Sequence, residues 1–322
     1  METPKVSIII LNWNGIGDTL ECLESVYRIR YDNLSVMVVD NGSTDDSCSR
    51  IRDRYPQVQL MENGANLGFA EGNNVGIRRA LGQDADYIFL LNNDTIVDPQ
   101  IVTELLAAAR HNDEVGIYGC KIYFHSEPAK IWYSGAMWDK NDCQFVHSRT
   151  DITEVAVTDY ACGCAMFISK KTLRIIGLMD PVFFLTFEET DWCYRALRHG
   201  IRSYCVPSAK VWHKISASFG GGASPVLTYF MVRNQLLWSE RNLSHVSHCK
   251  VIFTSLQSLV RCSLSEGKSP LLATGLVRLL VVIIRHLVGR YPSSVARANY
   301  LGFRDYFFRK FGACPDEVSQ LP

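Results

Sequence analysis

The feature that most constrains the fold is an alternation of short apolar runs with amphipathic segments over the first 110 residues. The apolar runs have the length and β-branched composition of buried strands, and we expect strands at 6–11, 34–39, 58–61 and 87–91. Apolar residues at helical spacing follow each run, at 19–29, 43–55, 70–81 and 99–110. Continuous apolar strands joined by helices are typical of a parallel sheet with helices on both faces. The chain is therefore predicted to be an α/β protein with a Rossmann-like, mostly parallel central sheet.

The pattern changes after this region. Short strand-like pieces with aromatic residues occupy 115–168 and indicate a mixed or antiparallel extension of the sheet. A loop rich in Gly and Ser is expected at 216–224, and every later segment has a helical pattern. We therefore expect an α/β domain over 1–225 and a C-terminal helical region over 226–322.

The composition fits a large folded protein. Of the 322 residues 47% are hydrophobic, which excludes a disordered chain and a coiled coil. Basic and acidic residues number 33 each, so the net charge is zero and nucleic acid is not an expected partner. The charge is unevenly distributed, because residues 246–322 hold ten basic and four acidic side chains, a net charge of +6, and residues 1–245 carry −6.

The basic region contains an apolar stretch at 271–289. Arg278 and Arg285 fall inside it, and burying each of them in a bilayer costs about 2.5 kcal/mol or more. Basic and apolar residues separate at helical spacing, which predicts an amphipathic helix rather than a spanning one. Two interpretations remain open: the helix docks on an anionic membrane surface, or it packs against the α/β domain or in a homodimer interface.

The eleven cysteines include no CxxC pair. Cys162 and Cys164 are close in sequence, and their spacing predicts two side chains on one face of a strand. We interpret the cysteines as small core side chains in a reducing compartment rather than as metal ligands. The first apolar run stops at Asn12 and is too short for the core of a secretory leader. A cytoplasmic protein is therefore expected.

Three of the predicted strands end in polar residues. The first ends in Asn12-Trp13-Asn14, the second in Asp40-Asn41-Gly42 and the fourth in Asn92-Asn93-Asp94. Ligands of open parallel sheets bind at the carboxyl ends of the strands, so these residues are predicted to share one crevice. Ordinary turn formation is the competing interpretation.

Two phosphate-binding motifs are incomplete or absent in the sequence, which limits the kinds of ligand this crevice is expected to bind. The first loop has only Gly15 and Gly17 of a dinucleotide-binding motif, and no P-loop occurs in the chain. Asp94 is a hard oxygen ligand of the kind that holds Mg²⁺ or Mn²⁺ beside a diphosphate. His213 would add a nitrogen ligand suited to Mn²⁺, although a single histidine is more often structural.

Six ordered motifs resemble the inverting glycosyltransferases of family 2, which have the GT-A fold. The motifs occupy 6–14, 39–45, 66–74, 91–94, 183–191 and 233–234. The resemblance extends from residue 5 to about residue 240, and its subtype is similar to bacterial rhamnosyltransferases. It implies that the domain expected over 1–225 is a GT-A catalytic domain.

The resemblance implies a nucleotide-sugar site at the strand ends. Asp40 would bind the pyrimidine base, and Asp94 and His213 would bind Mg²⁺ or Mn²⁺. Asn92 replaces the first acid of the family's DxD-like motif, which leaves one carboxylate fewer for the metal. The residues implied in donor binding are Leu11, Asn12, Asn14, Asp40, Asn41, Asn66, Gly68, Asn73, Asn93 and Asp94.

Glu189 occupies the position of the family's catalytic base, which is usually an aspartate. Glu188 and Asp191 are implied as residues that support the base or as alternative bases. Acids here would also suit the N-terminus of a helix expected at 188–200, where they complement the helix dipole without any chemistry. Arg233 and Asn234 are implied as contacts of the acceptor or the diphosphate. Trp192, beside the acids, could stack on a sugar face of the acceptor, and core packing is at least as good an interpretation of it.

The expected activity is inverting, metal-dependent transfer of a sugar, with dTDP-rhamnose as the favoured donor. The acceptor would be a hydroxyl group of a glycan or of a polyprenyl-diphosphate-linked molecule in bacterial cell-surface polysaccharide synthesis, at the inner face of the membrane. A catalytically silent, nucleotide-sugar-binding scaffold on the same fold is the alternative. A nucleotidyltransferase is disfavoured, because it would need a Gly- and Arg-rich phosphate loop near the N-terminus.

Overall fold

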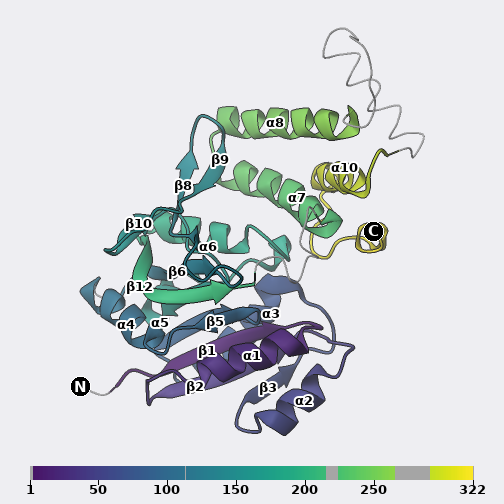
Figure 1. The fold of residues 1–322 in the computed structure, drawn as a ribbon. Coiled ribbons are helices and arrows are strands. Elements are labelled where there is room, and N and C mark those ends of the chain that lie inside the picture. The colour runs from purple at the N-terminus through teal and green to yellow at the C-terminus, as the bar shows by residue number, and fades with distance from the viewer. Residues whose placement is uncertain (1–2, 113, 215–223, 265–290, 322) are drawn as a thin grey trace. The chain divides into compact units, whose positions relative to one another are not determined.

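The computed structural model describes residues 3–112, 114–214, 224–264 and 291–321, and it divides into two compact units, 1–218 and 219–322 (Figure 1). The sequence had suggested a boundary at residue 225. The amphipathic helix expected at 271–289 lies outside the described residues.

The first unit is an α/β domain. Its elements are β1 (Val6–Asn12), α1 (Ile16–Val26), β2 (Leu34–Asp40), α2 (Ser47–Arg54), β3 (Gln59–Glu62), α3 (Gly68–Gly82), β4 (Tyr87–Asn92), β5 (Thr95–Val97), α4 (Ile101–His111), β6 (Ile117–Phe124), β7 (Ile131–Tyr133), β8 (Ala136–Asp139), β9 (Gln144–His147), β10 (Ala156–Thr158), β11 (Ala165–Ser169), α5 (Lys170–Ile176), the 3-10 helix η1 (Pro181–Phe183), α6 (Glu188–Arg198) and β12 (Ser203–His213).

The central sheet has the order β10-β12-β6-β11-β4-β1-β2-β3. β1 pairs in parallel with β2 and β4, and β2 pairs in parallel with β3. β11 runs antiparallel between β4 and β6, which confirms the predicted mixed extension. The chain order reverses on the two sides of β1, so the carboxyl ends of β1, β2 and β4 form the edge where a ligand crevice is expected.

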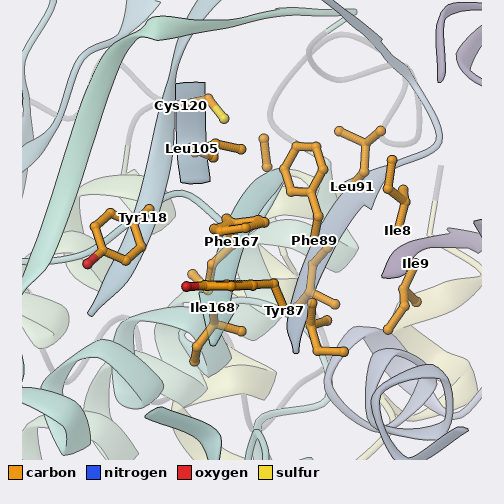
Figure 2. Close-up of a cluster of buried hydrophobic side chains, with 14 of the residues drawn as sticks. Ile8, Ile9, Tyr87, Phe89, Leu91, Leu105, Tyr118, Cys120, Phe167 and Ile168 are labelled. Carbon is orange, nitrogen blue, oxygen red and sulfur yellow. The ribbon is translucent and has the colours of Figure 1, made fainter. Parts of the chain in front are cut away.

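The core of this unit is continuous across the sheet (Figure 2). Ile8 and Ile9 point to opposite faces of β1 and both are fully buried, as expected for a strand covered on both sides. On the antiparallel neighbour of β4, Phe167 stacks on Tyr87 with ring centroids 4.8 Å apart, a contact worth about 0.5–1.5 kcal/mol beyond area burial. This packing holds the central strands in register and so fixes where their polar ends lie.

α2 begins at Ser47, four residues later than the sequence predicted. The polar residues that suggested an earlier helix start are used in the preceding loop instead. The backbone N–H of Ser43 donates to Asp40, and the N–H groups of Thr44 and Asp45 donate to Asn14. These tertiary hydrogen bonds outweigh the local capping preference that the pattern indicated.

The described parts of the second unit, 224–264 and 291–321, are mainly helical, as the sequence predicted. Its described helices are α7 (Pro225–Asn242), α8 (His245–Leu264), α10 (Ser294–Phe307) and α11 (Asp316–Ser319). Gly302 of α10 allows a close approach to α7, because a Cβ there would lie 2.5 Å from the carbonyl oxygen of Tyr229. Among the helices that the structure describes, none is long and apolar enough to cross a bilayer.

Candidate active site

The end of β2 forms the first part of the site around Asp40, which is 3% exposed. Its Oδ1 accepts a hydrogen bond of 2.8 Å from Nδ2 of Asn12, and its Oδ2 accepts one of 2.9 Å from the N–H of Ser43. Burial alone would raise the pKa of Asp40, but these donors hold its pKa below the ordinary value. Asp40 is therefore an ionised acceptor held in a fixed orientation beside the end of β1.

The loops after β1 and β2 are tied together by Asn14, which has a left-handed backbone with φ +50°. Its N–H donates to Oγ of Ser43 at 2.9 Å, and its side-chain oxygen accepts from the N–H of Thr44 at 2.7 Å. Ser43 also accepts from Asn12 at 3.1 Å. The sequence argument omitted Ser43 from the site, although a serine three residues after an aspartate is a recognisable turn pattern.

A second network lies beside Asp40 and is centred on Asn41. Its side-chain N–H₂ donates to Oδ1 of Asn66 at 2.9 Å and to the carbonyl of Gly68 at 3.1 Å. Leu11, at the end of β1, packs against Gly72 of α3, where a Cβ would lie 2.7 Å from a Leu11 methyl group. The structure thus brings Leu11, Asn41, Asn66 and Gly68 to the same edge.

Asn73 does not join this group. It is buried in α3, and its side-chain N–H₂ donates to the carbonyl of Phe69 in the same helix at 2.9 Å. The donor-binding role expected for Asn73 is therefore not supported. Its neighbour Asn74 instead exchanges two hydrogen bonds with the backbone of Met179, at 2.9 and 3.1 Å, and so anchors the segment that leads to α6.

The end of β4 forms the second part of the site. Asp94 is 5% exposed, and its Oδ1 lies 3.1 Å from Nε2 of His213 at the end of β12. β5 pairs with β12 in a register that places His213 opposite Thr95. Asp94 directly precedes Thr95, so this register brings the side chains of Asp94 and His213 together. Asn93 turns the other way, and its N–H₂ donates to Thr19 of α1 at 3.0 Å and to the carbonyl of Gly15 at 3.3 Å.

Asp94 and His213 fit a divalent metal ion. Nδ1 of His213 is buried without a hydrogen-bond partner, and the buried Oδ1 of Asp94 has only the ion-pair contact with Nε2 of His213. One carboxylate and one imidazole suit Mn²⁺ or Mg²⁺ when phosphate oxygens and water complete the shell. Within the described residues, no cluster of three or more His, Cys, Asp or Glu side chains could hold a metal.

The start of α6 forms the third part of the site, with two adjacent carboxyls. Glu188 is 4% exposed, and burial together with the charge of Glu189 raises its pKa well above the ordinary value. Burial also raises the pKa of Glu189, although N–H groups at the helix start and a hydrogen bond from Glu188 oppose this. One oxygen of each carboxyl is buried without a partner. Both carboxyls therefore bind a proton more readily than an exposed glutamate does, and the charge of Glu189 opposes ionisation of Glu188.

The loop before this pair has an unusual backbone. Phe184, Thr186 and Phe187 have φ values of +63°, +65° and +69°, a left-handed region that non-glycine residues rarely adopt. Gly68, with φ +79°, makes room for the loop, because a Cβ there would lie 2.5 Å from the carbonyl oxygen of Phe184. Such strain persists only where surrounding structure imposes it, and it commonly accompanies active sites.

The two acidic regions share one edge of the sheet. The carbonyl of Cys164 accepts a hydrogen bond of 2.9 Å from the N–H of Asn92, directly before Asn93 and Asp94. Gly163 packs against Glu189, because a Cβ built on Gly163 would lie 3.5 Å from Cβ of Glu189. A single turn therefore contacts both the strand end that carries Asp94 and the side chain of Glu189. Nothing in the sequence pattern pointed to Gly163.

Two residues near the pair have structural roles. Oδ2 of Asp191 accepts a hydrogen bond from Nε of Arg195 at 2.8 Å, and Arg195 also donates to the backbone of the segment before η1. Asp191 is thus engaged in anchoring α6. Trp192 is fully buried and donates to the carbonyl of Gly177 at 2.8 Å, which agrees with the core-packing interpretation of this residue.

Arg233 and Asn234 are both fully buried inside the second unit. Nη1 of Arg233 donates to the carbonyl of Gly312 at 2.7 Å, and its guanidinium lies over the rings of Tyr229 and Phe230. Nε of Arg233 donates to Asn234 at 2.9 Å. The diphosphate or acceptor contact expected for this pair is therefore not supported, since both side chains are enclosed by their own helices.

Residues 7–175, just over half of the chain, match the family model described as "Glycosyl transferase family 2". The chain is 26% identical over 275 residues to the dTDP-rhamnosyl transferase RfbF of Shigella flexneri, covering 82% of this chain and 90% of that protein. It is 27% identical over 212 residues to the N-acetylglucosaminyl-diphospho-decaprenol L-rhamnosyltransferase of Mycobacterium tuberculosis, covering 58% of this chain and 68% of that protein.

Among solved structures, the chain is similar to the mannosyltransferase PcManGT from Pyrobaculum calidifontis in complex with GDP-Man and Mn²⁺. The TM-score is 0.59 over 96% of this chain and 89% of that chain, at 13% sequence identity. This similarity confirms the expected GT-A fold.

Proposed function

Because the chain belongs to glycosyl transferase family 2, we propose that it is an inverting, metal-dependent transferase with dTDP-rhamnose as donor. The acceptor we propose is a hydroxyl group of a glycan or of a polyprenyl-diphosphate-linked molecule in bacterial cell-surface polysaccharide synthesis. Both relatives are named as rhamnosyl transferases, which supports the choice of sugar. The name of the second includes a decaprenol-linked diphosphate, which supports a lipid-linked acceptor.

The observation that carries the proposal is the convergence of three polar groups at one sheet edge. Asp40, oriented by Asn12 and Ser43, presents an acceptor suited to a pyrimidine N–H. Asp94 and His213 would hold a divalent metal ion, which when bound neutralises the charge that gathers on the departing nucleoside diphosphate.

Glu189 performs the proton transfer in this proposal. An alcohol is a weak nucleophile near neutral pH, so a carboxylate must take the hydroxyl proton as the new bond to the anomeric carbon forms. Burial raises the pKa of Glu189, which brings its proton affinity closer to neutral pH and makes it a stronger base. We place the proton of the pair on Glu188, from which it would be donated to Glu189 and orient the accepting carboxylate.

A silent scaffold is the second candidate. Burial of two adjacent carboxyls costs folding free energy, and a protein that only binds nucleotide sugar gains nothing from it. The unpartnered oxygens at Glu188 and Glu189 therefore favour a transferase.

The test is a donor panel of dTDP-rhamnose, UDP-sugars and GDP-mannose, scored by release of nucleoside diphosphate with Mn²⁺ and with a chelator. We expect release from dTDP-rhamnose that requires metal and that rises when a lipid-linked glycan acceptor is added. The variant Asp94→Ala should lose the metal requirement together with most of the activity.

Release from a UDP- or GDP-sugar alone would contradict the donor assignment. Nucleotide-sugar binding without turnover for any donor, in the presence of a lipid-linked glycan acceptor, would support the scaffold instead.

A further inference from the structure

Cys162, Gly163 and Cys164 form a tight turn directly before β11, rather than two positions on one face of a strand. The N–H of Ala165 donates to the carbonyl of Cys162 at 3.2 Å and closes the turn. The turn brings the two sulfur atoms to 3.7 Å from each other. The two thiols are thus in contact, whereas the extended backbone of a strand would have kept the two sulfur atoms farther apart.

The two thiols differ in accessibility. Cys162 is half-buried, whereas Cys164 is 4% exposed. An oxidant in solution therefore reaches Cys162 first, and Cys164 lies behind it as a second thiol in contact range. This arrangement of an accessible and a resolving thiol is typical of cysteines that oxidise reversibly.

The turn also touches both acidic regions of the site. Gly163, between the two cysteines, packs on Glu189, and the carbonyl of Cys164 accepts from the N–H of Asn92 at 2.9 Å. A disulfide requires the sulfur atoms to approach to about 2 Å. Closing it must tighten the turn and shift the backbone that supports Glu189 and the strand end before Asp94.

We propose that Cys162 and Cys164 are an oxidation site at which a peroxide forms an intramolecular disulfide, and that this disulfide slows sugar transfer. The effect on transfer rests on the proposed function; the oxidation itself does not.

The chemistry takes two steps. The sulfur of Cys162 attacks the O–O bond of hydrogen peroxide, that bond breaks, water leaves, and Cys162 becomes a sulfenic acid. The sulfur of Cys164 then attacks the sulfenic sulfur, the S–S bond forms, and a second water leaves. Two thiols are oxidised by two electrons, one peroxide is reduced, and both thiol protons end in water.

The experiment treats the full-length protein with hydrogen peroxide and measures the mass of the peptide that holds Cys162 and Cys164 beside the transfer rate. We expect this peptide to lose two hydrogens and the rate to fall about 10- to 100-fold, since a 1 Å misplacement of a catalytic group costs up to about 10²-fold. Dithiothreitol should restore both the mass and the rate.

Three variants separate the possibilities. Cys162→Ser, or Cys162→Ala if the serine variant unfolds, should keep its rate under peroxide, and Cys164→Ser should stop at an oxidised Cys162 without a disulfide. Cys249→Ser is the matched control, because Cys249 is exposed in the second unit and its loss should not protect the rate.

Two results would overturn the proposal. In the first, a peroxide treatment that oxidises Cys249 leaves Cys162 and Cys164 reduced. In the second, the disulfide forms and the transfer rate does not change. Absence of transfer before treatment would contradict the proposed function instead, and the peptide mass would still decide whether this turn is an oxidation site.

Discussion

At the scale of single residues, Glu188 and Glu189 show how one environment assigns two roles to identical side chains. Both carboxyls are enclosed at the start of α6, and burial raises the pKa of each. The backbone N–H groups of Glu189 and Thr190 oppose the rise in the pKa of Glu189, whereas the charge of Glu189 adds to the rise in the pKa of Glu188. The helical pattern alone showed three acids at a helix start, and only the family resemblance singled out Glu189 among them.

We expect Glu189→Gln to lower kcat by about 10²-fold or more, because the amide cannot accept the hydroxyl proton. Donor affinity should change little, since Asp40 and Asp94 remain. Steady-state kinetics combined with calorimetric titration of the donor with Mn²⁺ check both parts. A variant with full turnover would remove Glu189 from the mechanism.

Glu188→Gln should raise the free energy of unfolding, and the gain over the wild type should grow as the pH rises. A carboxyl whose folded pKa is raised stabilises the fold below its ordinary pKa of 4.5 and loses that contribution as the pH rises through the folded value. Glutamine keeps an N–H donor toward Glu189 and needs no proton uptake on folding to be buried uncharged. Thermal unfolding from pH 5 to 8 measures the effect, at about 2–4 °C in Tm for each kcal/mol. An advantage that shrinks with rising pH would contradict the assignment of the proton.

At the scale of elements, the site depends on the contact between the start of α3 and the loop before α6. Gly68 has φ +79° and leaves no room for a side chain beside Phe184, whose own φ is +63°. Three left-handed residues then place Glu188 at the first position of its helix. Local propensity disfavours this backbone, so tertiary packing has to impose it.

Gly68→Ala should therefore lower the free energy of unfolding by more than backbone strain alone would. Gly64 has a similar φ of +70° but open space around its Cβ position, so Gly64→Ala isolates the cost of the left-handed backbone, about 1–2 kcal/mol. Gly68→Ala should add about 1–3 kcal/mol for the clash and should also lower kcat, because the loop to Glu189 moves. Urea unfolding and kinetics of the pair provide the comparison. Equal losses in both variants would show that the contact with Phe184 does not support the site.

At the scale of the whole molecule, the neutral chain has an acidic part, residues 1–245, and a basic part, residues 246–322. α8 carries Lys250 and Arg261 and no acidic residue. A lipid-linked acceptor lies at a membrane surface, and a basic helical region is suited to the anionic leaflet that carries it. On this charge distribution we propose that the protein acts at the inner face of the membrane, as the sequence led us to expect.

The full-length protein should co-sediment with vesicles that contain anionic lipid and not with neutral vesicles, and salt should weaken the binding. Lys250→Glu should reduce binding at least fivefold, since each basic residue contributes about 1 kcal/mol at such a surface. Arg198→Glu changes the net charge equally but lies in the first unit, so it should bind like the wild type. Binding that is indifferent to lipid charge would reject the membrane proposal.

The sequence determined much of the first unit because its signals are local. Strand composition, helical spacing and polar strand ends depend on neighbouring residues alone, and they predicted the parallel half of the sheet and the edge that holds Asn12, Asp40 and Asp94. They could not predict the start of α2, because Ser43 and Asp45 form hydrogen bonds with Asn14, about thirty positions earlier in the chain. These long-range hydrogen bonds take the place of the local capping that the pattern predicted.

Only the tertiary structure decided which polar residues act together. It brought Asp94 beside His213 through the register of β5 and β12, and it buried Arg233 and Asn234, which the resemblance had placed at the site. It also folded Cys162 and Cys164 into a turn between the two acidic regions. The physical reason is that burial, pKa and side-chain contact depend on residues distant in the chain, whose meeting is set by packing rather than by any local pattern.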